Sequence, residues 1–145
     1  MEIYTAGFTK QSAEQFFESL KTAGVKNLLD IRLNNTSQLA AFAKRDDLAY
    51  FLREIACINY HHEPRLAPTQ ELLDAYKKNH GPWDAFAEGF TALLSERRVE
   101  ETIPRTTFDV STVLLCSEKS PERCHRRLVV QYFQAKWGNI TPIHL

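Results

Sequence analysis

The segment VLLCSEKSPERCHRR, Val113–Arg127, begins as an apolar run and ends as a charged one. Its first part is typical of a strand that is buried on both faces in the middle of a parallel sheet. Ser120 and Pro121 stand where a helix N-cap and a first helical residue belong. We therefore predict a strand over 110–116, a short turn and a helix over 121–137.

The residues on either side of this segment alternate between β-rich runs and amphipathic patterns. A capping box at Ser12–Gln15 predicts a helix between strands at 3–7 and 25–31. A polar stretch at 32–44 predicts a loop with one helical turn, and Asp46 or Asp47 is the expected cap of the next helix. The remaining expected elements are helices over 46–55, 69–78 and 83–99, and strands over 57–62 and 140–145. This order predicts one three-layer α/β domain over 1–145, with a mainly parallel sheet of about five strands between helices.

The composition is that of an ordinary globular protein, with 145 residues, 43% hydrophobic and 25% charged. Basic and acidic residues both number 18, which argues against a strongly basic nucleic-acid binder but leaves a local basic patch open. No apolar run approaches the roughly 18 residues of a membrane span, and the start lacks a signal-peptide pattern. We expect a cytoplasmic protein without a membrane partner, whose three cysteines are free thiols.

Polar side chains follow each of the first four expected strands. Because parallel α/β sheets bind ligands at the carboxyl ends of their strands, we expect a site at that edge. The helix N-terminus favours anions and lowers the pKa of a nearby thiol, which makes Cys124 a candidate nucleophile, although a buried structural cysteine is the alternative. The candidate catalytic residues are Cys124, His125, Glu118 and Asp30. The candidate substrate-binding residues are Arg32, Arg126, Thr9, His62 and Cys116.

The segment fits neither a phosphatase loop nor a zinc site well. Six residues separate Cys116 from Arg123, one more than in the phosphatase loop, and Glu118 would place a negative charge inside the anion cradle. No metal site is expected, because short ligand spacings are absent and adjacent Cys124 and His125 would point to different sides of a helix. No cofactor is indicated.

The chain resembles the family catalogued as domain of unknown function 488, and the resemblance extends from the first strand to the last helix. Asn34-Asn35 and Leu66-Ala67 replace the proline and the Leu-Gly that the family usually has there. The resemblance implies a compact α/β fold and no particular reaction. The residues that carry it are Tyr4–Thr9, Asp30–Arg32 with Ser37, Tyr60 with His62, Leu115–Glu118, Pro121 and Cys124–Arg127.

Two functions remain open. The first is a small enzyme or binding domain for an anionic substrate, such as a nucleotide or other phosphate ester, with Arg32 and Arg126 as anion clamps. The second is a non-catalytic, nucleic-acid-associated or regulatory module that uses the basic residues of 119–127. A structural alternative is that Glu118 or Arg126 only stabilises the strand-to-helix turn, and that Asp30 and Arg32 pair with each other.

Overall fold

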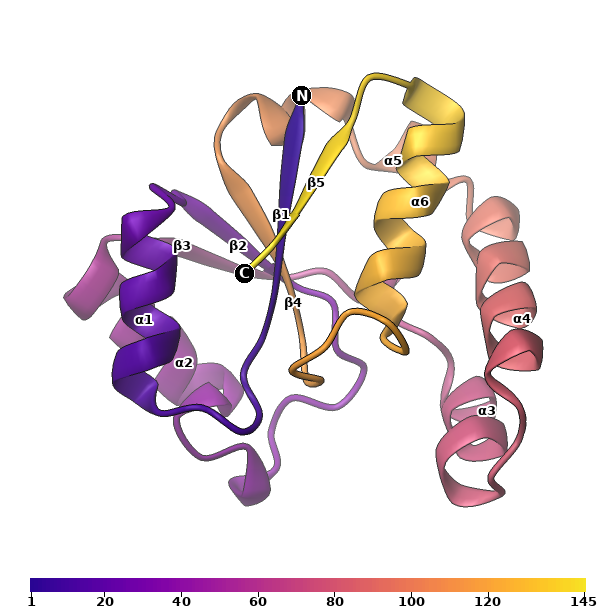
Figure 1. The fold of residues 1–145 in the computed structure, drawn as a ribbon, viewed down its shortest axis with the longest axis horizontal. Coiled ribbons are helices and arrows are strands. Elements are labelled where there is room, and N and C mark those ends of the chain that lie inside the picture. Colours follow the sequence, from indigo (N-terminus) through magenta and orange to yellow (C-terminus); the bar gives the residue numbers. More distant parts are fainter.

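The computed structural model describes residues 1–145 and contains one five-stranded sheet in which all strands are parallel (Figure 1). The strand order is β3-β2-β4-β1-β5, so β4 lies at the centre, between β2 and β1. This confirms the predicted α/β fold class. The strands are β1 (Glu2–Gly7), β2 (Asn27–Asp30), β3 (Asn59–His62), β4 (Thr112–Cys116) and β5 (Thr141–His144).

Helices cover both faces of the sheet and form the outer two of three layers (Figure 1). One face carries α1 (Ala13–Thr22) and α2 (Arg45–Phe51). The other carries α3 (Gln70–Leu73), α4 (Trp83–Glu96), α5 (Val99–Thr102) and α6 (His125–Trp137). None of these helices has the length and apolar character needed to cross a bilayer.

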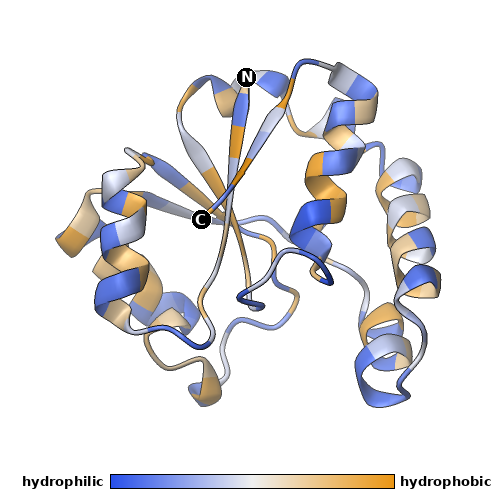
Figure 2. Cartoon of the chain, viewed as in Figure 1, coloured by the Kyte–Doolittle hydropathy of each residue, from blue (hydrophilic) through white to orange (hydrophobic).

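Each face of the sheet has its own apolar core, because side chains along a strand alternate between faces. Val113 and Leu115 of β4 pack with Phe16 under α1, whereas Leu114 packs with Phe90 and Phe133 under α4 and α6. The apolar stripes of the helices turn toward the sheet and their polar stripes turn away (Figure 2). β4 is therefore buried on both faces, as its uninterrupted apolar run predicts.

Several expected boundaries are confirmed and others are wrong. The capping box of Ser12 and Gln15 is present at the start of α1. The N-cap of α2 is Lys44, not Asp46 or Asp47, which lie in its first turn. The helix expected over 83–99 breaks after α4, because Arg98 adopts a left-handed conformation with φ 52°.

The most consequential correction concerns the start of α6, which is His125 and not Ser120 or Pro121. The Ser120 hydroxyl accepts a hydrogen bond from the backbone of Glu122, which makes a local turn rather than a helix cap. Cys124 is the N-cap, with extended backbone at φ −128° and ψ 139°. Residues 117–124 therefore form a loop that returns Cys124 and His125 toward the end of β4.

Candidate functional site

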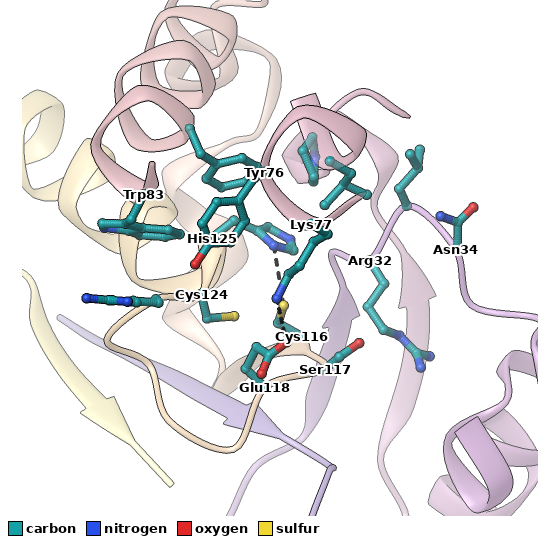
Figure 3. A pocket seen from close by; sticks show the side chains of 15 residues that line it. Arg32, Asn34, Tyr76, Lys77, Trp83, Cys116, Ser117, Glu118, Cys124 and His125 are labelled. Atoms are coloured by element: carbon teal, nitrogen blue, oxygen red, sulfur yellow. Dashed lines mark hydrogen bonds and ion pairs between the residues drawn. The ribbon is translucent and has the colours of Figure 1, made fainter. Parts of the chain in front are cut away.

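A cavity of about 180 Å³ lies at the carboxyl edge of the sheet, beside the ends of β2 and β4 (Figure 3). These two strands are neighbours, but their following loops lead to opposite faces, toward α2 and α6. Such a divergence opens a crevice at the strand ends, which is where α/β proteins bind ligands. A cavity therefore lies at the edge where the sequence predicts a site.

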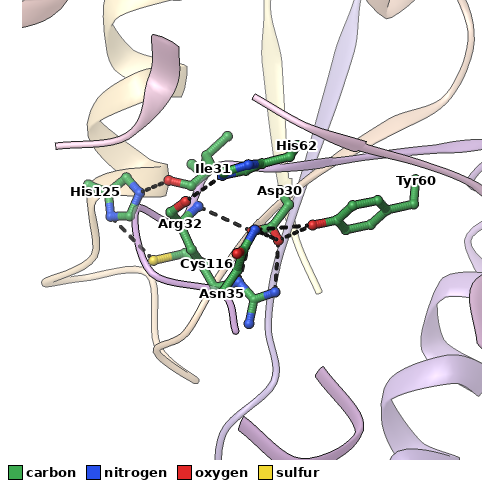
Figure 4. A network of polar contacts seen from close by, with 8 residues as sticks. All are labelled: Asp30, Ile31, Arg32, Asn35, Tyr60, His62, Cys116 and His125. Atoms are coloured by element: carbon green, nitrogen blue, oxygen red, sulfur yellow. Dashed lines mark hydrogen bonds and ion pairs between the residues drawn. The ribbon is translucent and has the colours of Figure 1, made fainter. Parts of the chain in front are cut away.

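Cys116 and His125 face each other at the base of this cavity. The sulfur of Cys116 lies 3.3 Å from Nδ1 of His125, and Nε2 of the same ring lies 2.7 Å from the main-chain oxygen of Ile31 (Figure 4). A carbonyl oxygen only accepts, so Nε2 carries the hydrogen and Nδ1 faces the thiol as an acceptor. Phe90 packs edge-on against the imidazole, with ring centroids 5.4 Å apart, and fixes its orientation.

The surroundings of Cys116 favour ionisation of its thiol. Burial raises the pKa of Cys116, but the Cys124 thiol, the backbone amides of Ser117 and Glu118 and the charge of Arg126 outweigh that effect and lower the pKa overall. Burial lowers the pKa of His125, so its imidazole is neutral and able to take a proton at neutral pH. The pair has the arrangement of a nucleophile with its base, and the Ile31 carbonyl orients the base.

Cys124 lies beside this pair but has the opposite electrostatics. Burial raises the pKa of Cys124 strongly, and its neighbour Cys116 raises it further. Cys124 therefore remains a protonated thiol that donates toward the Cys116 sulfur. Of the two thiols expected at this edge, Cys116 is the one more readily ionised.

Asp30 and Arg32 form a buried ion pair at the edge of the cavity, which Arg32 also lines. Arg32 donates from Nε and Nη2 to the two carboxylate oxygens of Asp30, each at 2.8 Å, and both side chains are buried. The Tyr60 hydroxyl donates to the same carboxylate at 2.6 Å, and Asn35 donates at 3.2 Å (Figure 4). Burial acts to raise the pKa of Asp30, but Arg32 and Tyr60 outweigh it and lower the pKa. The ion pair that the sequence offered as an alternative is thus present.

Arg126 holds the loop after β4 and does not reach the cavity as a clamp. Its side chain is fully buried and donates to the main-chain oxygens of Glu118 and Lys119, the latter at 3.0 Å. Thr9, two residues after the end of β1, anchors the same loop by donating to the Ser117 oxygen at 2.9 Å. A Cβ at Gly7 would lie 1.6 Å from the Glu118 oxygen, so only glycine allows this close approach.

His62 also contacts main chain, since its Nε2 lies 3.0 Å from the Arg32 oxygen. The structure therefore brings three predicted residues, Cys116, Cys124 and His125, together at the cavity. The predicted Glu118 also lines it, at the rim. Arg32 lines it too, but its guanidinium is paired with Asp30. The remaining predicted residues, Asp30, Thr9, His62 and Arg126, hold the strand ends and loops around it.

Lys77 is a cavity residue that the sequence did not single out. Its Nζ lies 2.9 Å from a carboxylate oxygen of Glu118, and both side chains are about half exposed. Burial acts to lower the pKa of Lys77, but the pairing with Glu118 outweighs it and raises the pKa. Lys77 comes from the helical turn after α3, far from Glu118 in sequence, and no motif spacing connects the two.

Aromatic rings form the wall opposite Cys116. Trp83 lines the cavity with Tyr76, and their ring centroids are 5.5 Å apart (Figure 3). The guanidinium of Arg127 lies over Trp83, 5.9 Å from the ring centroid. The basic side chains of the lining are Arg32, Lys77 and Arg123. The cavity thus combines basic groups, flat apolar surface and an ionisable thiol.

These observations define a parallel α/β protein with a buried thiol–imidazole pair at the carboxyl edge of its central strand. The chain belongs to the family described as domain of unknown function DUF488, whose sequence profile matches residues 12–133. This confirms the resemblance seen in the sequence. No curated protein and no solved structure matches the chain.

Proposed function

We propose that this protein is a thiol-dependent enzyme that binds a small anionic ester, such as a nucleotide or other phosphate ester, in the cavity beside β4. The observation that carries the proposal is the contact between the Cys116 sulfur and Nδ1 of His125, inside a cavity lined by basic side chains. Cys116 is the nucleophile and His125 its base. The alternative, a nucleic-acid-associated module, is less favoured because Arg126 of the basic segment is buried.

The proposed reaction begins when Nδ1 of His125 takes the proton of the Cys116 thiol. The sulfur then forms a bond to the electrophilic atom of the ester, and the leaving group departs with the electron pair of the broken bond. The protonated imidazole returns the proton to the leaving group. Attack of water on the adduct, with His125 again as base, releases the product and restores the thiol.

Arg123 supplies the positive charge for the anionic group of the substrate. Lys77 neutralises Glu118, so this carboxylate does not leave the cavity mouth negatively charged and does not repel the anion. Tyr76 and Trp83 offer flat surfaces to a planar part of the substrate, such as a nucleobase. Asp30, Arg32, Arg126 and Thr9 act as positioning residues, because their polar groups contact the protein itself.

Protection of Cys116 from alkylation tests the proposal. Metal-free protein in EDTA is treated with iodoacetamide, with and without a nucleoside monophosphate, and each cysteine is quantified by mass spectrometry. We expect saturable protection of Cys116 and no protection of the exposed Cys57. Protection that is absent, or equal at Cys57, contradicts the proposed binding site. Inorganic phosphate as a second probe separates binding of the charge from binding of the planar group.

A further inference from the structure

We propose that Cys116, Cys124 and His125 also form a site for one zinc ion, with a fourth coordination position that opens into the cavity. The metal site goes beyond the proposed function and does not depend on it. Its regulatory effect rests on that function: zinc and an ester substrate would compete for the Cys116 sulfur, so the metal would switch the thiol chemistry off reversibly.

The distances between the donor atoms suit a tetrahedral ion. One donor atom from each of the three residues lies within 4.8 Å of the other two, and the Cys116 sulfur is 3.3 Å from the His125 nitrogen. Zinc bond lengths of about 2.3 Å to sulfur and 2.0–2.1 Å to nitrogen place tetrahedral ligands about 3.6–3.8 Å apart. Side-chain shifts of about 1 Å or less therefore close the site around an ion.

The hydrogen bond of His125 to Ile31 supports the same role. Metal-bound histidines nearly always donate their second ring nitrogen to a carbonyl or carboxylate, which fixes the ring and the tautomer. Nε2 of His125 makes this bond to the Ile31 oxygen at 2.7 Å, so Nδ1 is left as the acceptor nitrogen and is turned toward the Cys116 sulfur (Figure 4). The imidazole is thus oriented as a ligand before any ion arrives.

Both cysteines bind the ion as thiolates, because Cys124, which is protonated in the metal-free protein, loses its proton when the metal binds. Arg126 is a fully buried cation whose partners are main-chain oxygens, and Lys77 stands at the cavity rim. Two thiolates and a neutral imidazole cancel the charge of Zn²⁺, so the filled site adds no net charge to a buried position. Cys116, Cys124 and His125 all line the cavity, so the ion has a path of entry.

The start of α6 explains why sequence spacing argued against this site. On a helix beginning at Ser120, Cys124 and His125 would diverge, but Cys124 is the N-cap and its backbone is extended. The loop 117–124 therefore returns Cys124 to Cys116, across a separation of seven residues. Two ligands come from this turn and one from the end of the central strand.

Cobalt substitution tests the site in the full-length, metal-free, reduced protein. Titration with Co²⁺ should give thiolate-to-cobalt charge-transfer and tetrahedral d–d absorption bands that saturate at one equivalent, and Zn²⁺ should displace them. Cys116→Ser and Cys124→Ser should each lose these bands. Cys57→Ser, which removes the exposed cysteine away from the site, should keep them.

A measurement on the unmodified chain does not rely on the variants folding. Stoichiometric Zn²⁺ should block iodoacetamide modification of Cys116 and Cys124 and leave Cys57 reactive. The inference is overturned if no saturable tetrahedral spectrum appears, if Cys124→Ser keeps it, or if zinc protects Cys57 equally. Ligand protection of Cys116 in EDTA is independent of these results, so failure of the zinc site and failure of the proposed function are distinguishable.

Discussion

His125 joins two neighbouring strands, because its Nδ1 lies 3.3 Å from the sulfur of Cys116 at the end of β4 and its Nε2 lies 2.7 Å from the Ile31 oxygen just after β2. The imidazole is therefore held on both nitrogens before substrate binds. A base that is oriented in this way loses little entropy when it takes the thiol proton.

Replacing His125 should slow the reaction of Cys116 with alkylating reagents. His125→Asn removes the acceptor at Nδ1, so the thiol loses its base. We expect roughly a 10²-fold slower alkylation of Cys116 at pH 7, within the usual contribution of general base catalysis. Mass spectrometry gives the rate at each cysteine, and Cys57 is the internal control. An unchanged ratio of the Cys116 and Cys57 rates would show that His125 does not activate the thiol.

The stability of the protein should fall in mild acid because of His125. Burial lowers the pKa of His125, so between its folded pKa and the ordinary value near 6.5 the unfolded chain binds a proton that the native state does not. The stability that the neutral His125 contributes to the folded state is fully present above about pH 6.5 and is lost as the pH falls through the folded pKa of His125. Urea unfolding over this range measures it. The loss of unfolding free energy in mild acid should be smaller in His125→Asn than in the unmodified protein. Because the pKa of His144 is also lowered, His144→Asn is the matched control variant.

Removing Asp30 should destabilise the fold strongly. Asp30→Ala leaves the buried guanidinium of Arg32 without a counter-charge, at an expected cost of about 3–5 kcal/mol in the free energy of unfolding. Glu18→Ala, which breaks the exposed pair with Lys21, should cost less than about 1 kcal/mol. Chemical denaturation compares the two variants. Similar small losses for both would mean that the Asp30 network does not hold the strand end.

A methyl group at Gly7 should displace the loop after β4. In Gly7→Ala the new Cβ would meet the main-chain oxygen of Glu118, and we expect a loss of about 1–3 kcal/mol together with slower alkylation of Cys116. Gly89→Ala in α4 is the control, because its Cβ meets only the flexible end of Leu72. Thermal unfolding and mass spectrometry would record both effects, and a Gly7 variant that behaves like the Gly89 variant would refute the close packing.

Replacing Lys77 should weaken anion binding and leave the thiol reactive. Lys77→Met removes the positive charge at the cavity rim and unpairs Glu118. We expect a higher concentration of nucleoside monophosphate to be needed for protection of Cys116, by about tenfold for a loss near 1.4 kcal/mol. Lys21→Met on α1 removes one positive charge far from the cavity as a control. Equal protection curves for the two variants would exclude Lys77 from the binding site.

The fold was predictable because its signals are local. The apolar run ending at Cys116, the capping box at Ser12 and the alternation of strands and helices each depend on a few neighbouring residues. The edge that carries the site follows from the parallel strands alone. The start of α6 was not predictable, because Arg126 stabilises the loop through the oxygens of Glu118 and Lys119 against the local preference of Ser120 and Pro121.

The roles within the site were predictable only in part. Sequence placed Cys116, Cys124 and His125 near one another but gave no means to choose between the thiols, since that choice depends on buried contacts. Lys77 was missed because it reaches Glu118 from a helical turn 41 residues away in sequence. Arg32 and Arg126 look like anion clamps in sequence, yet their partners are Asp30 and main-chain oxygens.

The pH dependence of Cys116 alkylation in metal-free protein tests the central claim most directly. The lowered pKa of Cys116 predicts that its reaction rate reaches half of its maximum below the pH of about 8.5 typical of a free thiol. Cys124, whose pKa is raised, should remain nearly unreactive across the same range. A Cys116 that reacts only above about pH 8.5, or a Cys124 that reacts first, would contradict the assignment of Cys116 as the nucleophile.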